Sequence, residues 1–227
     1  MKKFSQYLRE FYDTGAEPAG KPTEQKPAIV EQQPECDIDG ICNTIKNYES
    51  KGNEKKIRKV YKDSLGKDTI GHGHLVTKES NKIFKEVFAE EHKNNPKFAE
   101  SVLSGQAELN DEQMNKLLRY DVNTRLPEVK KKIPNLGTYS KRLQGELVSE
   151  YYRGLLPSSK NTISMINSGN LEGASKEYLN SMDYRRALVP KNNLGGVKTR
   201  IENLSNALKE EAILIAKKKE EKKEKSK

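Results

Sequence analysis

Apolar residues recur with helical spacing through most of the chain, most regularly in LNDEQMNKLLRYDVNTRLPEVKKKI (109–133). The apolar stripe of this segment consists of Met114, Leu117, Leu118, Val122 and Leu126. Asn110 or Asp111 can cap its first turn, and lysines fill its last turn, as the helix dipole favours. The pattern predicts one long helix, in which Pro127 should cause a kink or a local adjustment.

Shorter stretches of the same periodicity predict four more helical regions, at 41–51, 79–104, 141–181 and 197–216. The second should break near Asn95-Pro96, and the third is interrupted by GLLPSSKN. The last helix runs directly into a charged tail. The chain is therefore expected to be mainly helical.

One short region alternates apolar and polar residues instead. IRKVYKD (57–63) reads as a strand, SLGK (64–67) as a turn with Gly66, and DTIGHGHL (68–75) as a second short strand. Together the two patterns predict an α+β fold that is mainly α, with one small β-hairpin region.

The two ends of the chain differ in composition from its middle. Residues 1–13 can form a short amphipathic helix, and 14–35 are rich in Pro, Glu, Gln and Gly, which is typical of a flexible linker. We therefore divide the chain into an N-terminal helix plus linker (1–35), a folded domain (36–208) and a charged C-terminal tail (209–227).

The charge of the chain is strongly basic, with a formal net charge of +9. Residues 217–227 hold seven Lys and three Glu, which gives +4 of this total. A basic balance favours a polyanionic partner such as nucleic acid, anionic lipid or the bacterial cell wall, or serves only solubility. No nucleic-acid-binding motif is present, so no specific nucleic acid is expected.

Location and redox state follow from other features. No run approaches the roughly 18 apolar residues of a membrane helix, and MKKFSQYLREFY lacks the apolar region of a signal peptide. We expect synthesis in the cytoplasm of the cell that makes the protein. Cys36 and Cys42 are expected to be reduced thiols, with a small disulfide loop as the alternative.

Three residues near the hairpin could hydrolyse a glycosidic bond. Glu54 and Asp63 lie nine residues apart, and Thr69 follows on the second strand. A protonated carboxyl can donate to the leaving oxygen, while an ionised one activates water or stabilises the cation-like transition state. The hydroxyl of Thr69 could hold the water. Such spacing is common in charged chains, so the pattern alone is weak.

The sequence of residues 53–75, NEKKIRKVYKDSLGKDTIGHGHL, resembles the lysozymes of T-even bacteriophages, in glycoside hydrolase family 24. That signature is a Glu, an Asp nine residues later within Tyr-x-Asp, a Gly turn, and Thr-Ile-Gly-x-Gly-His-Leu. The resemblance implies Glu54 as general acid, Asp63 as second carboxylate and Thr69 beside the attacking water. A weaker collinear likeness covers about residues 45–208, with KLLRYDV (116–122) similar to the family's interlobe helix.

The resemblance implies a two-lobe fold, divided here into an N-lobe (36–108), the interlobe helix (109–133) and a C-lobe (134–208). It leaves the acid open, because Glu49 in NYESKGN also resembles the family's catalytic Glu if five residues are inserted before Asp63. The family also places an arginine of the last helix near this Glu. Arg200 and Arg185 are the candidates here.

The resemblance assigns further residues to structure and substrate binding. It implies that His74 pairs with Asp121 of the interlobe helix, a contact that should raise the pKa of His74. His72 falls at a variable position and is expected to be exposed. A metal site at the two histidines is disfavoured because no third ligand is evident.

On the substrate side, Leu75, Tyr151 and Thr162 match positions that line the saccharide cleft of the family. The amide that the family has near Tyr151 is not preserved, since Tyr152 or Arg153 takes its place in YYRG. This departure puts the arrangement on that side of the cleft in doubt.

The resemblance thus implies a phage-encoded muramidase that cleaves the β-1,4 bond between N-acetylmuramic acid and N-acetylglucosamine in peptidoglycan and needs no cofactor. The N-terminal segment and the basic tail exceed a minimal lysozyme and could attach the protein to phage virion or tail proteins. The alternative is a virion structural or wall-binding protein that keeps the fold without hydrolysis.

Overall fold

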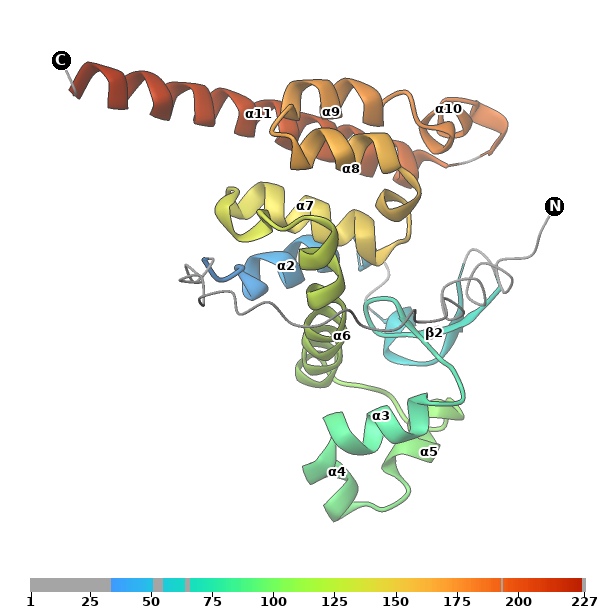
Figure 1. Cartoon of the computed structure of the whole chain (residues 1–227). Helices are drawn as coiled ribbons and strands as arrows, with labels where there is room; N and C mark the ends of the chain where they lie inside the picture. The colour runs from blue at the N-terminus through green and yellow to red at the C-terminus, as the bar shows by residue number, and fades with distance from the viewer. Residues whose placement is uncertain (1–33, 51–54, 64–65, 193, 226–227) are drawn as a thin grey trace, which may run out of the picture. The chain divides into compact units, whose positions relative to one another are not determined.

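The computed structural model describes residues 34–50, 55–63, 66–192 and 194–225. The predicted N-terminal helix and nearly all of the linker lie outside these residues. The described part forms a mainly helical α+β domain with ten α-helices, a small antiparallel sheet and a long C-terminal helix (Figure 1).

The helices before the long central one are α2 (Ile38–Glu49), α3 (Ser80–Val87), α4 (Ala89–Asn94) and α5 (Phe98–Leu103). The later ones are α6 (Asp111–Lys132), α7 (Lys141–Tyr152), α8 (Lys160–Asn167), α9 (Leu171–Tyr178), α10 (Met182–Ala187) and α11 (Gly195–Lys225). Short 3-10 turns are formed by Lys56–Arg58, Leu136–Thr138, Leu156–Ser158 and Pro190–Asn192.

The hairpin region has three strands rather than two. The strands are β1 (Tyr61–Lys62), β2 (Asp68–Ile70) and β3 (His74–Leu75), paired antiparallel in this order. The prediction of one strand over 68–75 was wrong, because Gly71 and Gly73 adopt φ of +58° and +98° and reverse the chain between β2 and β3. The first strand is also shorter than predicted, since Lys56–Arg58 forms a 3-10 turn.

The long helix was predicted within two residues at each end. Asn110 caps α6 in a capping box with Gln113, in which each side chain accepts from the other residue's backbone N–H. The helix continues through Pro127, which is exposed. Proline has no backbone N–H, so one carbonyl in the preceding turn loses its helical hydrogen bond. On the exposed side of the helix this carbonyl can bond to water.

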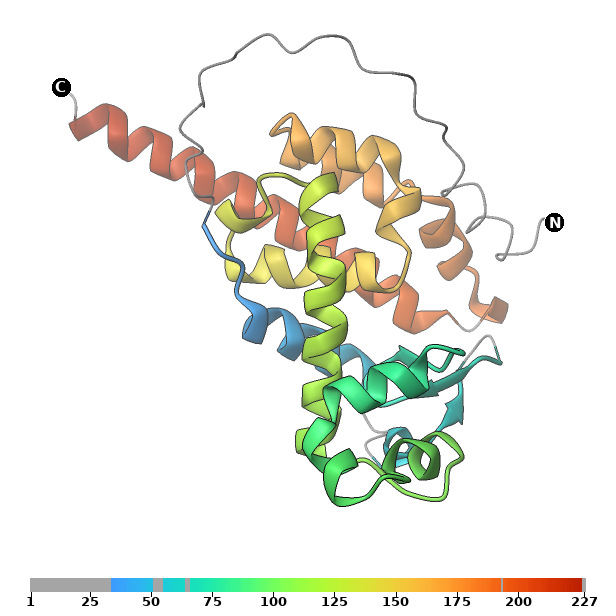
Figure 2. The same cartoon turned by 60° about the horizontal axis from the view of Figure 1, so that its bottom comes forward.

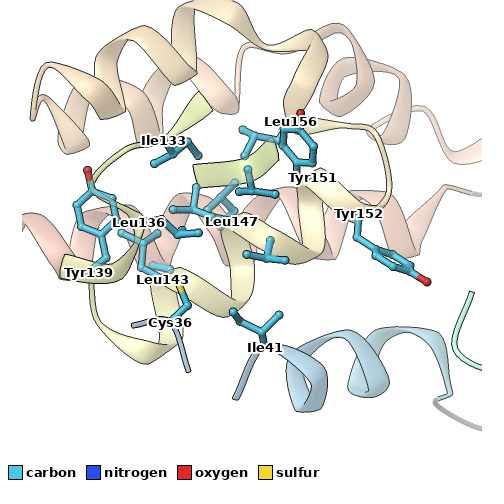
Figure 3. Packing of buried hydrophobic residues seen from close by; sticks show 14 of the residues in the cluster. Cys36, Ile41, Ile133, Leu136, Tyr139, Leu143, Leu147, Tyr151, Tyr152 and Leu156 are labelled. Atoms are coloured by element: carbon cyan, nitrogen blue, oxygen red, sulfur yellow. The ribbon is translucent and has the colours of Figure 1, made fainter. Parts of the chain in front are cut away.

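Two hydrophobic cores meet on α6. Met114 and Leu117 belong to the smaller core, formed with the sheet, α3 and α5, and Leu118 and Val122 belong to the larger core. The larger core joins α2, α7, α8, α9 and α11, and Figure 3 shows residues of α7 such as Leu143 and Leu147 in its interior. Figures 1 and 2 both show α6 running from the group of α3–α5 to the group of α2 and α7.

The last helix extends well beyond residue 216. It continues without a break through the lysine-rich segment to Lys225, and both views show its end projecting past α8 and α9. Across the described residues, no helix combines the length and apolar character needed to cross a membrane.

Because both hydrophobic cores include residues of α6, substitutions on this helix test the assignment of the cores. Leu118→Ala should lower the free energy of unfolding by about 2–5 kcal/mol, because Leu118 is 2% exposed in the larger core and its loss leaves a cavity. Leu214→Ala, a matched control at a 43% exposed position, should change it by less than about 0.5 kcal/mol. Urea denaturation of both variants measures the difference, and equal losses would contradict the core assignment.

Candidate functional site

The last residue of α2, Glu49, is held by two arginines from distant parts of the chain. Arg200 of α11 donates from Nη2 to Oε1 at 2.8 Å, and Arg153, directly after α7, lies 3.5 Å from Oε2. The side chain of Glu49 is only 10% exposed. A carboxylate so far removed from water needs such partners, so the two contacts explain why it tolerates burial.

Arg200 is itself fixed from three sides. Its guanidinium lies 4.4 Å from the ring centroid of Tyr48, and Nη1 is 3.4 Å from the Ser149 hydroxyl of α7. Its residue is 6% exposed. The contacts bring α2, α7 and α11 together at one point. Of the two predicted arginine candidates, Arg200 lies beside a glutamate, whereas Arg185 is exposed on α10.

The turn between β2 and β3 packs against this carboxylate. A Cβ atom added at Gly73 would lie 3.2 Å from the Tyr152 ring and 3.7 Å from Cδ of Glu49. Because Gly73 also has a positive φ, both its conformation and its close neighbours favour glycine. The glycines of TIGHGHL therefore bring the sheet close to Glu49.

The side chains of Tyr61, Thr69 and Leu75 form one row across the sheet. Tyr61 pairs with Thr69, and Thr69 pairs with Leu75. Directly opposed residues of antiparallel strands share a face, so these three side chains lie on the same side of the sheet. Thr69 is 4% exposed and donates from Oγ1 to the Lys67 carbonyl at 3.3 Å, while Leu75 is partly exposed.

Asp63 follows β1 and forms two hydrogen bonds within a tight turn. Its Oδ1 accepts from the Lys67 backbone N–H at 2.8 Å, and its carbonyl accepts from Gly66 N–H at 3.0 Å. The turn thus holds Asp63 in a defined position next to the row of Tyr61 and Thr69.

Tyr61 connects the two acidic positions electrostatically. Burial, followed by the negative charges of Glu49 and Asp63, raises the pKa of Tyr61 to about 12, against an opposing effect of Arg153. Tyr61 therefore lies within electrostatic reach of both carboxylates. Asp63 lies at the end of the sheet where β1 turns into β2, whereas Glu49 lies against the turn between β2 and β3 at the other end.

His74 joins the sheet to the central helix. Its Nδ1 lies 2.9 Å and 3.0 Å from the two carboxylate oxygens of Asp121, and its Nε2 is 3.4 Å from the Ser80 hydroxyl. Tyr152 of α7 donates to the same carboxylate at 3.1 Å. Asp121 therefore links the sheet and α7 through α6.

Tyr152 and Arg153 occupy the positions where the lysozyme family has an amide side chain that this chain lacks. The ring of Tyr152 is covered by the Arg125 guanidinium at 4.4 Å, and burial raises its pKa well above the usual value. Sequence reasoning left the roles of Tyr152 and Arg153 open. In the structure, Tyr152 donates a hydrogen bond to Asp121, and Arg153 donates one to Glu49.

Two other predicted residues, Tyr151 and Thr162, are not brought together with Asp63 and Thr69. Glu54 lies outside the described residues. Tyr151 is buried and donates to Glu128 of α6 at 2.6 Å, and Thr162 is buried on α8 with 2% exposed. Among the described residues, no hydrogen bond or ion pair joins either of the last two to the row on the sheet.

The expectation that His72 is exposed was wrong. It is 6% exposed and its Nδ1 lies 2.6 Å from the Ser50 hydroxyl after α2, because the tight turn folds it inward. Burial lowers its pKa to about 4. A pocket of about 570 Å³ borders His72 and is lined by Lys46, Asn47, Ser50, Ile57, Asp111, Met114 and Asn115. Glu49, Asp63 and Thr69 are not among its lining residues.

Two further acids, Glu146 and Glu150, are buried on α7. Tyr48 donates to Glu146 Oε2 at 2.8 Å, and burial raises the pKa of Glu146. Glu150 is completely buried and accepts from the Tyr178 hydroxyl, and burial raises its pKa to about 7. The sequence signal for both was two acids four residues apart in the otherwise apolar helix GELVSEYY, which sequence reasoning missed.

The described residues contain no group of three or more His, Cys, Asp or Glu side chains placed to hold a metal ion. Cys36 and Cys42 are buried free thiols. In the comparisons with known proteins, no family model and no curated protein matched the chain.

The buried Glu150 gives a pH prediction. Its pKa rises from an ordinary 4.5 to about 7 on folding, so between these values the unfolded chain releases a proton that the folded chain keeps. Stability should therefore fall as pH rises through this window and change no further above pH 7, by at most about 3 kcal/mol.

Glu150→Gln should remove this part of the pH dependence. Free energies of unfolding measured from pH 4.5 to 8 should decline less in the variant than in the wild type. The exposed Glu172→Gln serves as the control and should follow the wild type. Parallel curves for wild type and Glu150→Gln would contradict the prediction.

Proposed function

We propose that the protein is a muramidase that cleaves the β-1,4 glycosidic bond between N-acetylmuramic acid and N-acetylglucosamine in peptidoglycan. The observation that supports the proposal is that Arg200 and Arg153 hold Glu49 against the turn between β2 and β3, while Asp63 follows β1 and Thr69 lies on β2. Burial, and then the negative charges of Glu49 and Asp63, raise the pKa of Tyr61.

The two carboxylates have different surroundings, as glycosidic hydrolysis requires. Glu49 is largely shielded from water, and a general acid must carry a proton that it can donate to the leaving oxygen. Asp63 lies in a turn, where its Oδ1 accepts the Lys67 backbone N–H. We assign the general acid to Glu49 and the second carboxylate to Asp63.

Thr69 supplies the third group. Its hydroxyl lies on the same face of the sheet as Tyr61 and Leu75 and could position the water that attacks the sugar. Leu75, exposed in part, is available for contact with the saccharide. In this proposal Leu75 binds substrate and Thr69 orients water.

The fold supports the same proposal in outline. A small sheet-bearing core and a larger helical core share α6, the arrangement expected for a lysozyme-like fold with an N-lobe, an interlobe helix and a C-lobe. The basic net charge would favour encounter with an anionic cell wall. The phage origin, with delivery from the host cytoplasm or in the virion, belongs to the proposal through the resemblance at 53–75.

The assignment of the acid is tested by two variants. Glu49→Gln keeps the size of the side chain but cannot donate a proton, so it should lower the release of reducing sugar from isolated peptidoglycan by about 100-fold or more. Glu54→Gln should retain the activity of the wild type. The reverse result would assign the acid to Glu54, as the ungapped match to the family signature implies.

The second carboxylate is tested in the same assay. Asp63→Asn should lower the rate by about 100-fold or more, because it removes the negative charge opposite the acid. Asp68→Asn is the matched control on the neighbouring strand, where Asp68 pairs with Lys62 and is about half exposed. Equal activity of the two variants would remove Asp63 from the mechanism.

The same preparation distinguishes the alternative of a virion structural or wall-binding protein. Cosedimentation with insoluble peptidoglycan measures binding, and the reducing-sugar assay measures hydrolysis. A wild-type protein that sediments with peptidoglycan but releases no reducing sugar would support the alternative and overturn the muramidase proposal.

A further inference from the structure

The segment from α10 to the start of α11 exposes a group of large apolar side chains. Of the seven large apolar residues that are exposed in the described part of the chain, four lie between Met182 and Leu194. Met182 is 62% exposed, Leu188 50% and Val189 38%. Single exposed apolar residues are common on proteins, but a group of them on one short segment is typical of an interaction surface.

The spacing of these residues places them on the outer side of α10. Met182, Arg185, Arg186 and Val189 occur at i, i+3, i+4 and i+7, positions that share one side of a helix. Val189 continues the helical path, because its N–H donates to the Arg186 carbonyl at 3.3 Å. Ala187, the buried residue of α10, lies on the opposite side. Together with the exposed residue after the helix, they form what we call the α10 patch: Met182, Arg185, Arg186, Leu188 and Val189.

The inner side of α10 is fixed to α11, so the patch has a defined position. The Tyr184 hydroxyl donates to Glu202 Oε1 of α11 at 2.9 Å, and the Ser181 hydroxyl caps the helix by accepting from the Tyr184 N–H. The Asn192 side chain donates to the Arg186 carbonyl at 2.8 Å and closes the turn after the helix. Figures 1 and 2 show α10 beside the first turns of α11, at the opposite end from its lysine-rich extension.

The charged groups of the patch are positive. Arg185 and Arg186 are exposed, and neither guanidinium forms a hydrogen bond or an ion pair with another residue of the described chain. Lys191, in the 3-10 turn that follows, adds a third exposed cation. The one acid in the sequence 182–192 is Asp183, which is half-buried. A partner for this surface must therefore be negatively charged and must also cover apolar side chains.

The composition of the patch distinguishes between anionic partners. Single-stranded nucleic acids are bound by stacking their bases on aromatic rings, but the patch contains none. A phosphate backbone alone would be bound by the cations and would leave Met182, Leu188 and Val189 in water. An anionic bilayer fits both kinds of side chain. Its head groups attract Arg and Lys, and its boundary with the acyl chains accepts aliphatic side chains.

We propose that the α10 patch docks the protein reversibly on the surface of a membrane that contains anionic phospholipids. Met182, Leu188 and Val189 enter the boundary between head groups and acyl chains, while Arg185 and Arg186 bind lipid phosphates. With so few residues the contact is peripheral, and it weakens as salt screens the two arginines. The inference is independent of the proposed hydrolysis, because no residue of the patch is assigned to that chemistry.

The charged part of the patch is tested by cosedimentation of the full chain with vesicles of equal parts phosphatidylglycerol and phosphatidylcholine. Arg185→Gln/Arg186→Gln should lower the apparent affinity by about tenfold or more, because each basic residue at an anionic surface contributes on the order of fivefold. Lys218→Gln/Lys222→Gln removes the same charge from the far end of α11 and should keep most of the affinity. Equal losses in the two variants would make binding an effect of net charge and overturn the proposal.

The apolar part of the patch is tested by a fluorescent reporter. The chain contains no tryptophan, so Leu188→Trp introduces a single one. Its emission should shift to shorter wavelength when the anionic vesicles are added, and brominated lipid should quench it. Ile213→Trp, at a 55% exposed position on α11, is the matched control and should show neither effect. A Leu188→Trp spectrum that the vesicles leave unchanged overturns the proposal.

Other occupants of the patch give different results with the same proteins. If Arg185→Gln/Arg186→Gln loses cosedimentation with isolated peptidoglycan but keeps its binding to the vesicles, the patch contacts the wall and the membrane proposal fails. Met182→Ser/Val189→Ser keeps both arginines and should lower vesicle binding severalfold with an unchanged circular dichroism spectrum, since both positions are exposed. Wild-type affinity in this variant would contradict insertion of the apolar side chains.

Discussion

The ion pair between Glu49 and Arg200 is the interaction on which the arrangement of the site depends. It joins the end of α2 to α11, and Arg200 also reaches Ser149 of α7. A buried charge without its partner is strongly destabilising, so neither residue can be changed in isolation without cost. The pair therefore fixes where three helices meet and, with them, where the carboxylate of Glu49 lies.

The sheet is placed against this pair by a second polar contact. Asp121 accepts hydrogen bonds from His74 of the sheet and Tyr152 of α7 on one carboxylate, and Gly73 lets the turn approach both Tyr152 and Glu49. The two hydrophobic cores that share α6 are thus also connected by hydrogen bonds. These contacts, rather than any one element, set the position of the sheet relative to Glu49.

Much of the fold could be predicted from local patterns. The cap at Asn110 and the apolar stripe that starts at Met114 located α6 closely, because helix ends and amphipathic faces depend on nearby residues. The division of 68–75 into two strands was missed, since the alternation of residues does not reveal the positive φ of Gly71 and Gly73. His72 was misjudged for a related reason, because its burial arises from the fold of the turn.

The site shows the same division between local and long-range information. The sequence alone determined that Asp63 and Thr69 flank a glycine-containing turn, because they are close neighbours in the chain. It left Glu49 and Glu54 as rival acids. Only the tertiary structure brought Arg200, 151 positions away, to Glu49 and placed Ser149 of α7 beside the same arginine. Such contacts depend on the packing of α2, α7 and α11, which no local pattern records.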